Sequence, residues 1–120
     1  MTALSFRRLP IDPAEGFPQA FRLGIADRTY RFRLHANVAE ELIGSAGQFE
    51  LPIEGAFLVL EVGREEPVGL VPLLRRKLVP GVEYHAAELA LTFRTMRLDA
   101  RNLNGLGSFG SEVVGGVALR

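Results

Sequence analysis

The chain has 120 residues, with 14 basic and 14 acidic side chains and no cysteine. This length suits one domain with a single core, and the lack of cysteine excludes disulfides, thiolate chemistry and the commonest zinc ligands. A formal charge of zero provides no overall attraction to nucleic acid or to an anionic membrane, so we expect neither as a partner.

The first twenty residues contain turn-forming residues but no hydrophobic period: Pro10, Pro13, Gly16 and Pro18. They predict an extended N-terminal arm over residues 1–20, followed by a single β domain over residues 21–120. No apolar stretch of export-signal length follows Arg7 and Arg8, and the longest apolar run, residues 56–60, is too short to span a bilayer. We therefore expect a protein that is made in the cytoplasm and stays soluble.

Apolar and polar residues alternate over residues 21–25 and again over residues 30–34. Alternation of this kind predicts two half-buried strands. The link of residues 26–28 is short and contains Asp27, which favours an antiparallel hairpin. The outer face of this hairpin would carry a row of arginines: Arg22, Arg31 and Arg33.

The next segment has the start and stop signals of a short helix. Asn37 is a potential cap, Glu40 follows three residues later, and Gly44 comes after Leu42 and Ile43. We expect about two helical turns, with an irregular loop as the alternative.

Residues 56–62 are apolar on both faces until Glu61, which predicts a strand at the centre of the core. Residues 63–67 predict a turn, and residues 68–74 a returning strand. Pro72 has no backbone donor, so this strand belongs at a sheet edge or contains a bulge.

The last third of the chain begins with a turn at Val79-Pro80-Gly81. The periodicity of residues 86–96 is compatible with either a strand or a helix. The β-prone side chains favour a strand, with a bulge near Arg94. Residues 102–110 predict a loop and residues 113–119 a last strand. The fold class that follows is mainly β, a small antiparallel barrel or two-layer sandwich with one short helix.

No set of side chains has the spacing of a catalytic, cofactor or metal site. His35 and His85 are fifty residues apart and lack neighbouring ligands. The Gly-x-Gly-x-x-Gly string that ends at Gly110 is not placed between a strand and a helix, as a nucleotide site requires. We predict that the protein is not an enzyme and binds no cofactor.

Charge is unevenly distributed along the chain. Residues 1–36 have a formal charge of +3, residues 37–66 of −6 and residues 67–120 of +3. Such segregation can orient a partner or a second copy, unless the blocks interleave and cancel in the fold. The residues that we predict to dock a partner are cations and glycines: Arg22, Arg31, Arg33, Arg75, Arg76, Gly105, Gly107 and Gly110.

The order of these segments resembles the small tail and baseplate proteins of phages of the baseplate-plug type. The matching pieces are Gln19-Ala20-Phe21-Arg22-Leu23, Tyr30-Arg31-Phe32, residues 57–62, Leu78-Val79-Pro80-Gly81-Val82-Glu83, and residues 103–107 before Val113. The chain departs from that family in having no tryptophan and in residues 37–54, which look like an insertion.

The resemblance implies a non-catalytic virion component that assembles in the host cytoplasm. Its partners would be other tail or baseplate proteins, such as tube and hub proteins, and several copies would be present in one particle. A different class of function, a small ligand-binding β-barrel module, is the alternative that the apolar hairpin of residues 57–74 favours.

Overall fold

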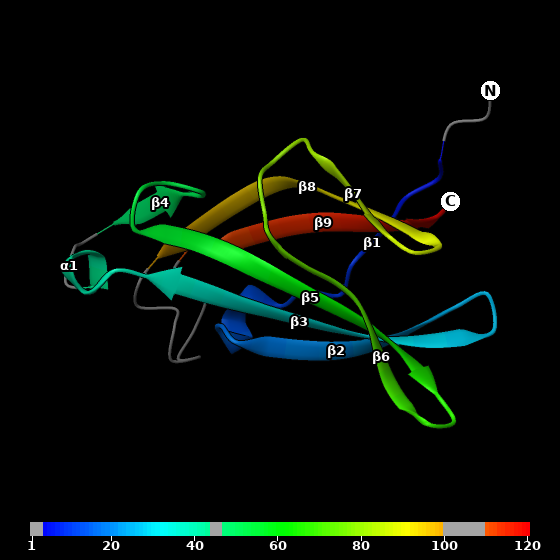
Figure 1. Cartoon of the computed structure of the whole chain (residues 1–120). Coiled ribbons are helices and arrows are strands. Elements are labelled where there is room, and N and C mark those ends of the chain that lie inside the picture. The colour runs from blue at the N-terminus through cyan, green and yellow to red at the C-terminus, as the bar shows by residue number, and fades with distance from the viewer. Residues whose placement is uncertain (1–3, 44–46, 100–109) are drawn as a thin grey trace.

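The computed structural model describes residues 4–43, 47–99 and 110–120. Its strands form two antiparallel sheets that stack face to face (Figure 1). One sheet has the order β2 (Gln19–Ile25), β3 (Arg28–Val38), β5 (Ala56–Glu66) and β6 (Gly69–Lys77). The other has the order β1 (Arg7–Arg8), β9 (Glu112–Leu119), β8 (Leu89–Asp99) and β4 (Gln48–Glu50), with β7 (Glu83–Ala86) also paired to β8.

This arrangement confirms the mainly β fold class and selects the two-layer sandwich from the two architectures expected. In the described residues the sheets remain separate and do not close into a barrel. Apolar side chains from both inner faces form one core between the sheets, with large and fully buried members on each: Tyr30, Phe32, Leu58, Leu60, Leu91, Phe93, Met96 and Leu98. No helix of the described part is long and apolar enough to cross a membrane.

The predicted hairpin of residues 21–34 is confirmed as β2 and β3. Ala26 and Asp27, at the turn, both have positive φ, 49° and 65°. Two residues in this conformation match the right-handed twist of the flanking strands, which is why such turns connect hairpins. The register places Phe21 opposite Phe32, and their rings stack with centroids 5.1 Å apart.

Strand β5 lies between β3 and β6, as the apolar run predicted, and its alternate residues Leu58, Leu60 and Val62 are buried. The prediction of a turn at residues 63–67 is wrong in its starting point, because the strand is longer than expected. Because Gly63 and the residues after it pair with β3 or β6, β5 continues to Glu66 and the chain reverses at residues 67–68.

The prediction for Pro72 is confirmed in both of its forms. Strand β6 is an edge strand, and its register with β5 shifts between Val62 and Gly63. Val62 pairs with Leu74 and Gly63 with Pro72, so Leu73 is the extra residue of a bulge. An edge strand pairs on one side alone, so Pro72 can lack a backbone N–H without removing a hydrogen bond from the ladder.

The helix prediction for residues 37–44 is correct in type but wrong in extent. Asn37 is not a helix cap, because β3 continues through it and pairs it with Phe57. The helix α1 (Glu40–Ile43) is a single turn. Pairing with the long strand β5 outweighs the local capping preference of Asn37, and Gly44 lies outside the described residues.

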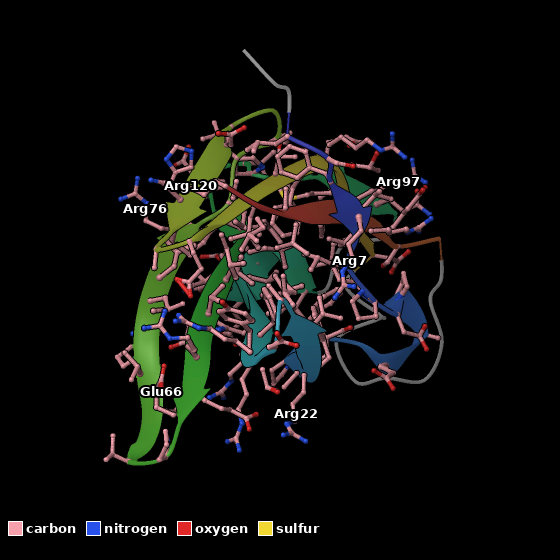
Figure 2. All side chains as sticks on the ribbon, turned by 90° about the vertical axis from the view of Figure 1, so that its right-hand side faces the viewer. Arg7, Arg22, Glu66, Arg76, Arg97 and Arg120 are labelled. Carbon is pink, nitrogen blue, oxygen red and sulfur yellow. The ribbon has the colours of Figure 1, made fainter. Side chains whose placement is uncertain are left out.

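The segment before residue 21, expected to be an extended arm, is part of the sandwich where the structure describes it. Strand β1 pairs with β9, a short 3-10 turn covers Pro13–Glu15, and Leu9, Ile11 and Phe17 are buried. The Arg7 guanidinium donates a 2.7 Å hydrogen bond to the carbonyl of Gly24, which joins β1 to β2 of the opposite sheet (Figure 2).

The strand interpretation of residues 86–96 is confirmed by β8. Its register with β9 shifts between Phe93 and Thr95, so the bulge predicted near Arg94 is present. The last strand is confirmed as β9. Of the loop expected at residues 102–110, only Gly110 lies within the described residues.

Candidate docking surface

The outer face of the β2-β3-β5-β6 sheet carries the arginine row that the alternation predicted. Burial of Phe32 and Leu34 on the inner face turns Arg31 and Arg33 outward. Arg22 lies directly opposite Arg31 in the β2–β3 ladder, and Figure 2 shows it pointing away from the interior. Three arginines from two strands therefore share one surface.

This face is hollowed into a groove with a volume of about 750 Å³. Residues of all four strands line it: Ala20, Phe21, Arg22, Arg31, Phe32, Arg33, Glu61, Val62, Gly63, Leu70, Pro72, Leu73, Leu74 and Arg75. The groove thus combines an apolar lining with four guanidinium groups.

Glu65 holds two of these arginines in position. Its carboxylate accepts hydrogen bonds from the Arg22 Nε at 2.7 Å and from the Arg31 Nε at 3.0 Å. A second oxygen accepts from the Arg22 terminal nitrogen at 2.9 Å, which makes that pair bidentate. The hydrogen bond from Arg22, followed by that from Arg31, lowers the pKa of Glu65 to about 2.

The other two arginines are less constrained. Arg75 approaches Glu61 at 3.8 Å, and the same carboxylate is 3.9 Å from His35. Arg33 is exposed, and among the described residues its side chain has no ion-pair or hydrogen-bond partner. Four arginines and two glutamates, Glu61 and Glu65, surround the groove, so positive charge is in excess. Arg33 is the arginine whose charge is not paired within the described residues.

The apolar part of the groove depends on the close approach of β5 and β6. A Cβ atom on Gly63 would lie 2.8 Å from the side chain of Leu70. Glycine at this position therefore lets Leu70 lie flat against the sheet. Leu70 still exposes 50% of its surface, and Pro72 beside it is also exposed, so apolar surface remains open to a partner.

The structure brings together four of the eight residues predicted to dock a partner, namely Arg22, Arg31, Arg33 and Arg75. Arg76 is on β6 but does not line the groove. Gly110 has a φ of 85° and lies against the side chain of Gln48, so its conformational freedom is used inside this chain. Gly105 and Gly107 lie outside the described residues.

Sequence reasoning did not place Glu61, Leu70 and Pro72 in the groove that they line, and it did not find Glu65, which binds two of the groove arginines. Glu61 and Glu65 belong to the acidic block of residues 37–66, and in the fold they lie among arginines of both basic blocks. The charge blocks therefore interleave here. The period of two in β5, continued past residue 62, is the signal that could have placed both glutamates on the outer face.

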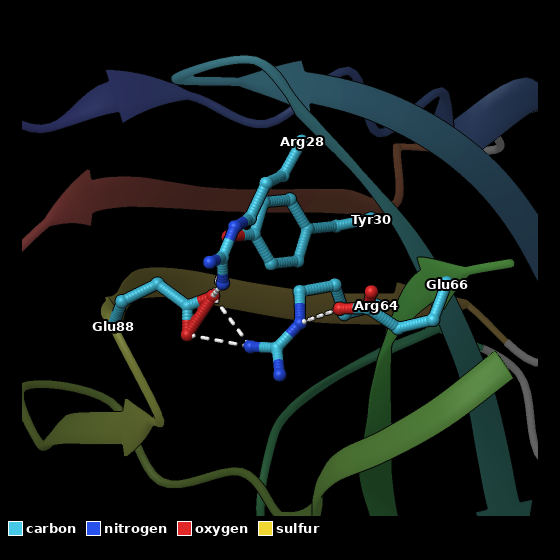
Figure 3. Close-up of polar contacts among 5 residues, drawn as sticks. All are labelled: Arg28, Tyr30, Arg64, Glu66 and Glu88. Carbon is cyan, nitrogen blue, oxygen red and sulfur yellow. Dashed lines mark hydrogen bonds and ion pairs between the residues drawn. The ribbon is translucent and has the colours of Figure 1, made fainter.

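A second charged cluster joins the two sheets (Figure 3). Glu88, in the turn between β7 and β8, accepts hydrogen bonds from the Tyr30 hydroxyl at 2.7 Å and from Arg64 at 2.6 Å, and Arg28 contacts it at 3.0 Å. The Tyr30 hydrogen bond, together with Arg64, lowers the pKa of Glu88 to about 2, and burial raises the pKa of Tyr30. Arg64 also binds Glu66 at 2.6 Å, so the cluster is fully paired and is structural.

The other sheet has a smaller hollow of about 270 Å³, lined by Phe6, Arg7, Arg8, Thr92, Arg94, Val114, Gly115 and Gly116. It is basic, but Arg7 is already engaged by Gly24. Within residues 4–43, 47–99 and 110–120, no three histidine or acidic side chains converge as metal ligands would.

The fold and the groove define a β-sandwich with an apolar hollow on one outer face that is rimmed by arginines. Comparison with protein-family models, with curated proteins and with solved structures finds no match to this chain. The chemistry of the groove is therefore the basis for assigning a function.

Proposed function

We propose that this chain is a non-catalytic structural component of a phage tail, a baseplate or a related tail-like particle, and that it docks against tube or hub proteins. The observation that carries the proposal is the groove of β2-β3-β5-β6, where four arginines surround exposed apolar side chains. An apolar centre with a charged rim is the usual anatomy of a protein interface. The resemblance in segment order to small phage tail and baseplate proteins supports this choice of particle.

The electrostatics of the groove suit assembly more than chemistry. Glu65 holds Arg22 and Arg31 on a rigid sheet, so these side chains present a fixed pattern of charge. Fixed complementary charge sets the register of docking and raises association rates more than it raises affinity. The protein would act in the virion after assembly in the host cytoplasm.

The experiment compares incorporation into particles. Particles from the strain that carries the gene are purified with the wild-type chain, with the double variant Arg22→Glu and Arg33→Glu, or with the control Arg76→Glu, which changes the charge of a β6 arginine outside the groove. Mass spectrometry should detect the wild type and the control in particles and the groove variant at a level at least about tenfold lower. Absence of the wild-type chain from every particle fraction contradicts the proposal.

A second candidate function rests on the size of the same groove. A volume of about 750 Å³ is within the range of small-molecule sites, and its lining would suit an apolar molecule with an anionic head. A panel of fatty acids and aryl carboxylates distinguishes the two functions. A rise in melting temperature that Arg33→Glu abolishes supports the ligand-binding module; no shift across the panel favours protein docking.

A further inference from the structure

The end of the sandwich that carries α1 and β4 has the opposite chemistry to the groove. We name it the acidic end and define it by Glu40, Ile43, Glu50, Ile53 and Glu54. All five side chains are exposed, with Ile43 at 51% and Ile53 at 39%. Neither Glu40 nor Glu54 has an ion-pair partner among the described residues. Glu50 lies 4.0 Å from Arg97, which is a long ion pair.

These residues belong to one structured surface. The Ala39 amide donates a 2.6 Å hydrogen bond to the carbonyl of Gly55. A Cβ atom on Gly55 would lie 3.1 Å from Ala39 and 3.4 Å from Leu42, so α1 rests directly on the turn that contains Ile53 and Glu54. The acidic end therefore presents carboxylates and isoleucines on a supported surface.

The groove and the acidic end are complementary in charge and in polarity. The groove has more arginines than glutamates, and Arg33 lacks a partner there; the acidic end has unpaired carboxylates. Leu70 and Pro72 expose apolar surface in the groove, and Ile43 and Ile53 do so at the acidic end. Opposite charges around an apolar contact favour a specific protein interface.

The two surfaces of one molecule cannot meet. Strand β3 carries Arg31 and Arg33 in the groove and leads through Val38 to α1, and the five residues from Arg33 to Val38 span about 16 Å. Figure 1 shows α1 and β4 at one end of the sandwich and the turn between β5 and β6 at the other. Because α1 is held against Gly55, it does not fold back onto the groove.

We infer that the acidic end of one copy docks in the arginine-rimmed groove of a second copy of this chain. The contact joins two different surfaces, so it repeats from copy to copy and generates a ring or a filament. This inference rests on the proposed function and narrows it: within the particle the groove contacts a neighbouring copy of this chain, and tube or hub proteins contact other surfaces.

Sedimentation velocity on the purified full chain tests the inference. The wild type should associate as its concentration rises from about 10 μM to about 1 mM, and salt should weaken the association because the contact is partly ionic. The groove variant Arg33→Glu with Arg75→Glu and the end variant Glu40→Lys with Glu54→Lys should each raise the dissociation constant at least about tenfold. Thermal unfolding verifies that each variant is folded.

Mixing identifies which surfaces meet. In an equimolar mixture of the two variants, every groove again faces an end of opposite charge, so association should return to within about threefold of the wild type. The controls Arg76→Glu and Glu15→Lys change the charge in the same directions, by half as much, outside both surfaces and should leave association unchanged. A wild type that is monomeric at every concentration, a mixture that stays monomeric, or controls that are as weak as the variants would overturn the inference.

Failure of the inference and failure of the proposed function give different results. A chain that is monomeric alone but enters particles through its groove leaves the proposed function intact and excludes self-docking. A chain that self-associates through both surfaces but is absent from particles supports self-docking and contradicts the proposed function.

Discussion

Arg22 and Arg31 occupy directly opposed positions in the β2–β3 ladder, and the carboxylate of Glu65 on β5 binds both guanidinium groups. Like charges in opposed positions destabilise an antiparallel pair. Glu65 relieves this repulsion and fixes both arginines at the rim of the groove. The charge pattern of this outer face is therefore coupled to the stability of the sheet that carries it.

Replacement of Glu65 by Gln should lower the free energy of unfolding, because Arg22 and Arg31 would face each other without an anion. Salt screens exposed charges, so the difference from the wild type should be larger at about 20 mM than at about 500 mM NaCl. Urea titrations at both concentrations measure it. The control Glu15→Gln, at an exposed glutamate away from the arginines, should show no such dependence; equal behaviour of the two variants would contradict the role of Glu65.

Acid should destabilise the protein through Glu88. Its pKa is about 2 in the folded chain and about 4.5 when unfolded, so its contribution is complete above pH 4.5 and is lost as the pH falls toward 2. Glu88→Gln should cost about 1–3 kcal/mol at neutral pH, since the charge-assisted bonds with Tyr30 and Arg64 are weakened.

The same variant should also flatten the stability curve between pH 4.5 and 2.5, because it cannot take up the proton that acid adds to Glu88. Urea unfolding at constant ionic strength across this range measures the slope. An unchanged slope in Glu88→Gln would show that other carboxylates cause the acid sensitivity.

Gly115 should tolerate no side chain. A Cβ atom there would lie 2.5 Å or less from two ring carbons of Phe93, which is fully buried. Gly115→Ala should therefore lower the free energy of unfolding by about 1–3 kcal/mol through overpacking. Gly24→Ala, in an open strand position with no heavy atom nearer than 4.0 Å, is the matched control and should change stability little. Equal melting temperatures for the two variants would contradict the packing argument.

Leu9 should contribute to the core although it precedes the first long strand. It is 2% exposed, and its amide donates to the carbonyl of Gly115 at 2.9 Å. Leu9→Ala should cost about 2–4 kcal/mol in chemical denaturation. Arg8→Ala, at the exposed neighbouring residue, should cost less than about 0.5 kcal/mol. A Leu9→Ala variant as stable as the wild type would show that the Leu9 side chain does not stabilise the core.

Local patterns in the sequence were reliable where one strand or one turn decides the structure. Alternation predicted which residues of β2 and β3 point outward. The missing donor of Pro72 predicted an edge strand or a bulge, and the structure has both. The bulge near Arg94 followed from the same period of two. Such features depend on neighbours in the chain, so sequence order contains the information.

Long-range pairing decided what those patterns could not. Asn37 has the local signature of a helix cap, but pairing with Phe57 on β5 keeps it in a strand. Leu9, Ile11 and Phe17 show no period, yet they are buried because β1 pairs with β9 and places them against the core. Ladder pairing at Asn37, and burial at the other three residues, outweigh what the local sequence favours.

The sequence by itself determined the β class, the first hairpin and the row of arginines on its outer face, because a two-residue period is a property of adjacent residues. Only the tertiary structure decided that Glu65 lies between Arg22 and Arg31, that Leu70 covers Gly63, and that α1 rests on Gly55. Glu65 reaches both arginines, and Leu70 reaches Gly63, because β2, β3, β5 and β6 pair side by side in one sheet. Strand pairing therefore forms the groove, and the contact of α1 with Gly55 supports the acidic end.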